Sequence, residues 1–522
     1  MELPVKLLLE GAPKRQRYFR VAHILFGDGG GCGGEWLHAS ACEELLVAAA
    51  GYLKEGLSVR DVHKFRRWCK ENPHWCLEEC LVSTQDEDDV GTRADLAMQH
   101  ALSALDRSRG EDIGSASNQS SPLTAKRSRL EAVELHELRE QLRVAEVFAD
   151  MHDHGAMSKT LNRLLVSVQS MYQTTLNSHK VEFFFVQLEI IRRSVELFLS
   201  SGDLNAVRGL VGASTTTLIE NAAQCLLSAQ GGNSSHVALQ QRCSEEMMSE
   251  LEECVLFFSM VRALGMFEDR DFKGFANVFT ANGLRGAKWA PIAEELITKR
   301  GTSQVAASLG ARVNSPGALP AIRNLRRFVG EFITSGTQLG VMLLFCAVAA
   351  LPRMEALELV SRVDVMQLWE DVPGAHMILQ ALRQARFADA LRSASVLATM
   401  MLKTDLFAYK HSELLLLQMK QSIIAGYTSS FARLDLRKTA MRLSISLEEL
   451  HQILRKLIID GRLAAKMDLV AHVLLRTEPN EDTREYSTPC SVLLDCIHRN
   501  DRCAADLEQS LRLLSLHRHR AW

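Results

Sequence analysis

Apolar side chains recur at every third or fourth position from about residue 130 to residue 426, and short polar breaks divide this pattern into segments. Such spacing places the apolar side chains on one face of an α-helix. Turn-forming residues mark the breaks, for example His154-Gly155 and Gly202-Asp203. Before residue 300 the pattern predicts helices at residues 135–153, 157–175, 179–200, 214–228, 237–266, 272–281 and 291–299.

These helices follow one another as pairs with a period of about 34–40 residues, which is typical of helical repeat proteins. The periodicity repeats, but no residue signature repeats with it. Because each pair can bury its apolar face only against its neighbour, we expect residues 130–300 to form a TPR-like helical solenoid. The fold class is therefore expected to be all-α.

A polar loop at residues 301–319 separates this region from a second group of shorter helices. The longest apolar run, residues 339–351, has about 13 residues, whereas a membrane span needs about 20. The pattern therefore predicts packed core helices and no membrane partner. These helices are expected at residues 319–334, 338–351, 353–360, 376–386, 387–402 and 406–426.

The pattern changes at Tyr427, where shorter elements begin. A helix is predicted at residues 434–443, and a second one begins after Ser446. Ser446 and Glu449 have the spacing of a capping box, in which the hydroxyl accepts from the Glu449 amide and the carboxylate reaches back. Gly461 ends this helix, at a position that needs a left-handed backbone.

Two strand-like runs, residues 462–466 and 471–475, follow and are joined by a tight turn at Asp468. Helix, turn, helix and β-hairpin in this order predict a winged helix over residues 427–476, which completes a domain that begins at residue 319. The hairpin is the wing. An exposed wing strand can pair with a strand of another chain, because its backbone N–H and C=O groups lack partners.

After a polar loop, apolar residues alternate at spacings of three and four over residues 487–522. This is the pattern of a bundle or coiled-coil helix. We expect this terminal helix to bundle with partner chains, the alternative being packing on the protein's own helices. Its apolar seam includes Ile497, Leu507, Leu511 and Leu514.

The N-terminal residues 1–83 are predicted to be partly helical, with a glycine-rich loop at residues 27–34 and a helical stretch at residues 39–82. Residues 84–129 begin acidic, turn polar and contain few apolar side chains, which predicts a disordered linker. Within it, residues 126–129 (Lys-Arg-Ser-Arg) have the composition of a nuclear-import patch, although a solvated linker is the favoured interpretation.

The composition is that of an ordinary globular protein. Of the 522 residues, 47% are hydrophobic and 24% charged, which allows about three domains. The net charge of −3 argues against a general nucleic-acid or membrane-surface binder. The 12 cysteines are scattered and the N terminus does not resemble a signal peptide, so we expect free thiols in the cytosol or nucleus.

The candidate chemical sites are incomplete. Residues 152–154 (His-Asp-His) contain the His-x-His pair of a zinc site, but no third ligand follows at a useful spacing, so a helix-end role is favoured. Cys69, Cys76 and Cys80 lack the Cys-x-x-Cys spacing of structural zinc sites. Residues 27–34 lack the Lys and hydroxyl of a phosphate-binding loop. We therefore expect no catalytic residue, no metal and no cofactor.

Nucleic-acid binding is the main rival function, because many winged helices bind DNA. Residues 433–476 contain nine Lys or Arg and five Asp or Glu, an excess of four positive charges. The second helix would read the DNA, but it opens with Glu448 and Glu449, which repel phosphate. Direct nucleic-acid recognition is therefore not the favoured prediction.

Helical repeats that lead directly into a winged helix resemble the PCI family, whose members are subunits of the proteasome lid, the COP-nine signalosome and translation initiation factor three. The resemblance covers roughly residues 135–517 and is strongest at residues 340–470. A Tyr-x-Ser-x-aromatic lead-in and an Asp-Leu pair look closer to the signalosome, and the Gly-Arg-Leu wing start looks closer to the paralogous lid subunit. These motifs are Tyr427, Ser429 and Phe431, then Asp435 and Leu436, then Gly461, Arg462 and Leu463.

This resemblance implies a non-catalytic scaffold subunit of the signalosome, which serves the removal of Nedd8 from cullins. A lid subunit, an RNA-associated PCI protein of translation or export, and an unrecognised enzyme are the alternatives. The implied partners are other PCI subunits, the zinc-bearing isopeptidase subunit of the same complex and cullin-RING ligases, in the cytoplasm and nucleus. The expected interface residues are Arg462, Leu463, Ala465, Lys466, His472, Leu474, Ile497, Leu507, Leu511 and Leu514.

Overall fold

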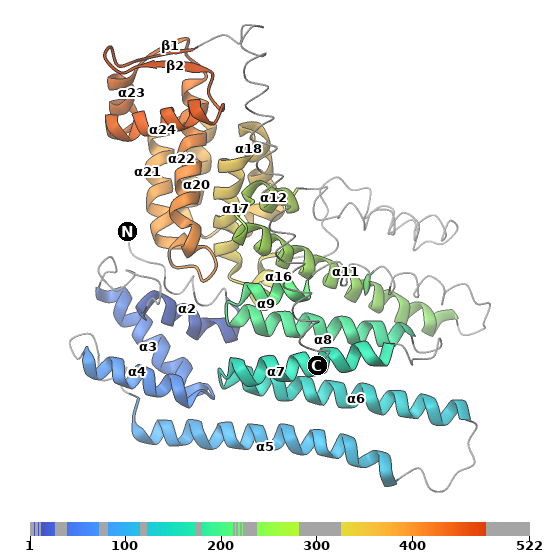
Figure 1. Ribbon diagram of the computed structural model, residues 1–522. Helices are drawn as coiled ribbons and strands as arrows, with labels where there is room; N and C mark the ends of the chain where they lie inside the picture. Colours follow the sequence, from blue (N-terminus) through green and yellow to red (C-terminus); the bar gives the residue numbers. More distant parts are fainter. Residues whose placement is uncertain are drawn as a thin grey trace, which may run out of the picture. The chain divides into compact units, whose positions relative to one another are not determined.

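The computed structural model describes residues 12–26, 39–72, 82–114, 123–172, 180–211, 237–280 and 325–476, with a few single positions between them (Figure 1). The chain forms two compact units, Met1–Lys420 and Gln421–Trp522. The glycine-rich loop at residues 27–34, the predicted helix at residues 291–299 and the terminal helix at residues 487–522 lie outside the described residues. The same holds for most of the helix predicted at residues 214–228.

The first unit is helical throughout its described part, as the apolar periodicity predicts. Consecutive helices pack on their neighbours in sequence, so α5, α6, α7 and α8 lie side by side (Figure 1). This arrangement confirms the predicted series of helices in the described residues, although several ends differ by three residues and α6 begins 12 residues before the predicted start at residue 135. The elements up to residue 280 are α2 (Lys14–Phe26), α3 (Ala39–Glu55), α4 (Val59–Glu71), α5 (Thr84–Gly114), α6 (Leu123–Asp150), α7 (His154–Tyr172), α8 (Lys180–Ser200), α9 (Leu204–Leu210), α11 (Val237–Glu268) and α12 (Phe272–Val278).

The prediction of a disordered linker at residues 84–129 is wrong over its described part. Residues 84–114 form α5, and residues 123–129 are the first turns of α6. The Ser83 hydroxyl accepts from the Asp86 amide at 3.0 Å, and the Asp86 carboxylate accepts from the Ser83 amide at 2.7 Å, so a capping box starts α5. The acidic run is thus the first helical turn, where the helix dipole favours negative charge.

The apolar face of α5 is narrow and built from small side chains, which explains the wrong prediction. Val90, Ala94, Ala101 and Leu105 are buried. The last two pack with Val144 of α6 in one hydrophobic cluster. Few large apolar residues are needed for this contact, so the overall composition of the segment still looks polar.

The N-terminal helix α2 is anchored in the core of the first unit. The Gln16 side chain donates to the Ile333 carbonyl at 2.6 Å, across 317 positions of sequence. The Arg20 guanidinium donates to Thr334, Gln338 and Asp405, and it is buried with 1% of its side chain exposed. The N-terminal region is therefore part of the helical unit and not an appendage.

Helix α17 packs against α12, α16, α18 and η4, and its residues Gly336–Ala349 are all buried. A Cβ at Gly340 would lie 2.7 Å from the Leu368 Cβ, so only glycine permits this close approach. Among the described helices none alone is long and apolar enough to cross a membrane; α16 and α17 pass that test only as a pair, bent by 110°. The elements are α16 (Leu325–Phe332), α17 (Gly336–Ala350), α18 (Arg353–Ser361), α19 (Val363–Met366), α20 (Pro373–Arg383), α21 (Phe387–Leu397), the π-helical turn η4 (Ala398–Leu402), the 3₁₀ turn η5 (Tyr409–His411) and α22 (Ser412–Thr428).

The second unit contains the predicted winged helix. Its described elements after α22 are β1 (Arg433–Asp435), α23 (Leu436–Leu443), α24 (Leu447–Ile459), β2 (Ala465–Asp468) and β3 (Val473–Arg476). The strands form an antiparallel sheet in the order β1-β3-β2. The two helices and the hairpin are confirmed, and β1 is an additional strand that the sequence analysis missed.

Candidate interaction site

The helical half of the winged helix is fixed by its caps. The Asp435 carboxylate accepts from the Lys438 amide at 3.1 Å and starts α23. The Ser446 hydroxyl accepts from the Glu449 amide at 3.0 Å and starts α24, as the capping-box spacing predicts. Between the two helices Ser444 adopts a left-handed conformation with φ of 56°. These short local contacts turn the chain sharply enough for α23 and α24 to share one core.

The predicted end of α24 at Gly461 is also confirmed, since its φ is 68°. The amides of Arg462 and Leu463 both donate back to the Leu457 carbonyl, at 2.9 and 3.1 Å. These two residues therefore belong to the helix cap. For this reason β2 begins at Ala465, three residues later than the strand predicted at residues 462–466.

The wing turn is held by one carboxylate. Asp468 accepts from the amides of Val470 and Ala471, each at 2.9 Å. The hydrogen bonds from Ala471 and then Val470 lower the pKa of Asp468. The turn leaves Val470 93% exposed and Leu469 44% exposed, so two neighbouring apolar side chains stand at the tip of the wing.

The sheet offers an open edge. Strand β3 lies in the centre, and within the described residues no strand pairs with the outer side of β2. Backbone N–H and C=O groups on the edge of a sheet can pair with a strand from another chain. The geometry of the wing thus permits strand addition at Ala465–Asp468.

The outward face of the sheet carries charge in two rows. Cross-strand pairing aligns Arg433 with Leu475 and Leu475 with Lys466, so two cations flank one leucine. In the adjacent row Asp435 pairs with Val473 and Val473 with Asp468, so two carboxylates flank one valine. A partner surface that fits this face would need an apolar strip with opposite charges on both sides.

The structure divides the predicted wing residues between surface and core. Arg462 and Lys466 are exposed. Leu463, Ala465 and Leu474 are buried at 8%, 8% and 4% exposure, so these three side chains support the wing from within. The predicted interface residues Ile497, Leu507, Leu511 and Leu514 lie outside the described residues.

His472 is half-buried and packs against a second histidine of the winged helix. Its ring stacks on that of His451 from α24, with centroids 5.5 Å apart and an interplanar angle of 7°. The His451 Nε2 and the His472 Nδ1 are buried and have no hydrogen-bond partner among the described residues. Burial, followed by the nearby His472 and Arg455, lowers the pKa of His451.

The exposed apolar residues of the wing, Leu469, Val470 and Leu475, were missed in the sequence analysis. Two apolar residues at the centre of a tight turn are an available signal, because a turn that faces only water is usually polar. Leu474 and Leu475 are adjacent, and in a strand adjacent side chains point to opposite faces. One of them therefore had to be exposed.

The His-Asp-His motif at residues 152–154 spans the end of the turn after α6 and the first residue of α7. His152 pairs with the Asp61 carboxylate through Nδ1 and packs on Phe19, with ring centroids 4.4 Å apart. Burial alone would raise the pKa of Asp61, but hydrogen bonds from His152 and Ser58 outweigh it and lower the pKa. Among the described residues no group of three or more His, Cys, Asp or Glu could hold a metal. Cys69 is buried, and Cys76 and Cys80 lie outside the described residues.

Comparison with known protein families agrees with the geometry of the winged helix. Residues 397–478 match the family model of the PCI domain. The matched segment contains η4, α22, the winged helix and its complete sheet. No curated protein matches the chain. Residues 397–478 of this chain are therefore a PCI domain.

Proposed function

We propose that this chain is a non-catalytic scaffold subunit of the COP-nine signalosome, similar to its first subunit. The observation that carries the proposal is a PCI domain whose wing has an open strand edge within the described residues. PCI domains mediate assembly with other PCI subunits in multiprotein complexes. The lead-in residues Tyr427, Ser429 and Phe431 favour the signalosome among these complexes.

In this function the wing supplies binding and no chemistry. The edge of β2 adds backbone hydrogen bonds with a neighbouring strand, and Leu469 and Val470 add apolar contact at the tip. The partners are other PCI subunits and the zinc-bearing isopeptidase subunit, which removes Nedd8 from cullins. Cullin-RING ligases are then indirect or transient partners, and the complex works in the cytoplasm and nucleus.

The paralogous proteasome lid subunit is the alternative, because Gly461, Arg462 and Leu463 at the start of the wing look closer to that subunit. Both complexes would use the same wing, so the geometry of the wing does not separate them. The identity of the partner subunits distinguishes the signalosome from the proteasome lid.

Affinity purification of the tagged full chain, followed by mass spectrometry, tests the proposal. Co-purified signalosome subunits, including the isopeptidase, are the expected result, and the tag alone is the control. Recovery of lid subunits instead would establish the alternative. Recovery of the chain without any PCI subunit would overturn the scaffold function itself.

A further inference from the structure

The outer face of the winged-helix sheet carries a regular pattern of charged and apolar side chains. Leu434, Leu474 and Met467 form a row across β1, β3 and β2, and the two leucines are buried at 7% and 4% exposure. Neighbouring side chains of a strand point to opposite faces, so the residues before and after this row face outward. These outward residues are Arg433, Asp435, Lys466, Asp468, Val473 and Leu475.

The charges on this face are separated by sign. In one row the cations Arg433 and Lys466 lie on the two sides of Leu475, and in the next row two carboxylates lie on the two sides of Val473. The rows are two residues, or about 7 Å, apart along each strand. One half of the face is therefore positive and the other half negative, with the apolar side chains of β3 between the charges.

All four charges of the pattern persist in the folded chain. Arg433 and Lys466 are exposed, and neither side chain makes a hydrogen bond or an ion pair with a described residue. Asp435 and Asp468 accept from backbone amides through Oδ1, and these hydrogen bonds lower the pKa of both carboxyl groups, so both are ionised near neutral pH. Lys438 Nζ lies 4.0 Å from the Oδ2 atom of the first carboxylate, but its side chain is 74% exposed, so this ion pair is weak.

The pattern is complementary to itself. A twofold rotation about an axis that runs across the strands, between two such faces, places the positive row of one copy on the negative row of the other. Arg433 then meets Asp435 of the second copy, Lys466 meets Asp468, and the apolar side chains of the two β3 strands pack on each other. Because a twofold interface is isologous, each of these ion pairs occurs twice.

The other face-to-face orientation brings like charges together. A twofold axis parallel to the strands would place β1 on β2 of the second copy. Arg433 would then face Lys466, and Asp435 would face Asp468. Like charges across an interface oppose binding, so the charge pattern favours one mutual orientation of two copies and disfavours the other.

The size of the face predicts a weak contact. Three strands about 4.8 Å apart, with up to four residues each, cover about 14 Å by 14 Å. Leu469 and Val470, at the tip of the wing next to the negative row, enlarge this area. A standard interface buries about 800 Å² on each partner, which is more than this face offers. We therefore expect a reversible dimer with a Kd above about 1 µM.

We propose that the outer face of the winged-helix sheet binds the same face of a second copy of this chain, in the twofold arrangement that pairs the positive row with the negative row. This contact differs from the assembly of PCI subunits at the edge of β2, because an added strand extends the sheet in its own plane and leaves the outer face uncovered. The homodimer therefore does not depend on the signalosome assignment, and either can fail without the other.

Sedimentation velocity of the purified full chain, at concentrations from about 1 µM to about 200 µM, tests this proposal. We expect the sedimentation coefficient to rise with concentration from that of a monomer toward that of a dimer. Added salt should shift the equilibrium toward the monomer, because exposed ion pairs are screened. A monomer at every concentration, or a dimer that salt does not weaken, would overturn the proposal.

Two charge-reversal variants locate the contact. Lys466→Glu should raise the Kd of the dimer at least about tenfold, because its attraction to Asp468 of the second copy becomes a repulsion that occurs twice. Lys159→Glu makes the same change of charge at an exposed position of α7, in the first unit, and should leave the Kd unchanged. Circular dichroism melts of both variants confirm folding. An unchanged Kd in folded Lys466→Glu, or an equal rise in both variants, would exclude the outer face.

The direction of the effect also tests the orientation of the two copies. If β1 lay on β2 of the second copy, Lys466→Glu would replace a repulsion from Arg433 by an attraction and would lower the Kd. A tighter dimer would therefore overturn the proposed arrangement. Leu475→Glu places a charge at the centre of the face, on a side chain that is 44% exposed, and should also raise the Kd at least about tenfold. A dimer that persists in this variant would place the contact elsewhere, for example at the edge of β2, and the proposal would be wrong.

Discussion

Arg20 and Asp405 form a buried ion pair across 385 positions of sequence, with Nη1 3.2 Å from Oδ2. Their side chains are 1% and 0% exposed. The pair joins α2 to the turn after η4, and the Asp405 carboxylate also accepts from the amides of Phe407 and Ala408 at 2.8 Å. Helix α2 is therefore bonded to the turn that leads into α22, through the same carboxylate that accepts from the amides of that turn.

Arg20→Met should destabilise the first unit by about 3–5 kcal/mol, because it leaves the Asp405 charge buried without its partner. Urea denaturation of the full chain, followed by circular dichroism, measures this loss as a lower midpoint. Arg20→Met combined with Asp405→Asn removes both charges and should recover part of the stability. A double variant as unstable as the sum of the two single variants would show that the pair has no coupling.

Gly340 and Gly209 provide a matched pair of helical glycines. A Cβ at Gly340 would approach the Leu368 Cβ to 2.7 Å, whereas a Cβ at Gly209 would meet nothing within 4 Å. Gly340→Ala should therefore cost about 1–3 kcal/mol through overpacking of α17. Gly209→Ala should stabilise α9 by about 0.5–1 kcal/mol, because alanine loses less backbone entropy. Thermal melts of the two variants should shift in opposite directions, and a shift in the same direction would contradict this account of α17.

The stacked pair of His451 and His472 should make the wing sensitive to acid. The pKa of His451 is lowered from its ordinary value of 6.5 by burial, by His472 and by Arg455. The unfolded segment therefore binds the proton more readily than the folded one. The contribution of neutral His451 to the stability of the wing is fully present above about pH 6.5. It decreases as the pH falls through that value, and the decrease ends once His451 is protonated in the folded state as well. Asp468 is the carboxylate that lies near this histidine pair, on the side of His472.

Hydrogen exchange of the β2 and β3 amides in the full chain measures this effect. Exchange should accelerate between about pH 7 and about pH 5 beyond the intrinsic dependence on pH. His451→Gln should remove the excess acceleration. His154→Gln is the matched control, because the pKa of His154 is also lowered but this residue lies in α7. The histidine pair is not the acid-sensitive group if His451→Gln keeps the wild-type profile.

The winged helix could be predicted from the sequence because its signals are local. Ser446 and Gly461 mark the two ends of α24 within a single helix, and both act as predicted. Strand β1 has only three residues, and it becomes a strand by pairing with β3 after the chain has folded. No local pattern could indicate it.

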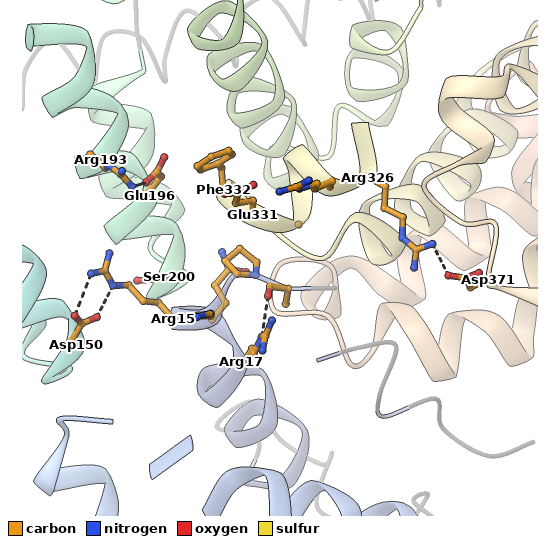
Figure 2. Close-up of a pocket in the computed structure, with 16 residues that line it drawn as sticks. Arg15, Arg17, Asp150, Arg193, Glu196, Ser200, Arg326, Glu331, Phe332 and Asp371 are labelled. Carbon is orange, nitrogen blue, oxygen red and sulfur yellow. Dashed lines mark hydrogen bonds and ion pairs between the residues drawn. The ribbon is translucent and has the colours of Figure 1, made fainter. Parts of the chain in front are cut away.

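The cleft lined by Lys14 of α2 and Arg327 of α16 (Figure 2) could not be predicted from the sequence for the same physical reason. Lys14 lies on α2 and Arg327 on α16, and an exposed Lys or Arg is ordinary on a helix surface. Only the tertiary contacts of α2, such as that of Gln16 with the Ile333 carbonyl, bring these charges together. The hairpin of the wing was predicted, but its exposed side chains were not. Leu463 and Leu474 were expected at the interface and are buried in the structure.

The tip of the wing should be the most sensitive point of subunit assembly. Leu469→Glu with Val470→Glu places two carboxylates on side chains that are 44% and 93% exposed, so folding should be unaffected. A partner that buries this tip must desolvate both charges, at a cost greater than about 1.4 kcal/mol. The yield of PCI subunits co-purified with the tagged chain should fall at least about tenfold.

Met354→Glu is the control for this change, since Met354 is 76% exposed on α18, outside the PCI domain. It adds a carboxylate at an apolar position whose exposure lies between those of Leu469 and Val470, and it should leave the yield of partners unchanged. Undiminished recovery of PCI subunits with the tip variant would exclude the wing tip from the interface. Equal losses in the two variants would indicate a general effect of added negative charge. A larger loss in the tip variant is expected only if the partner contacts Leu469 and Val470.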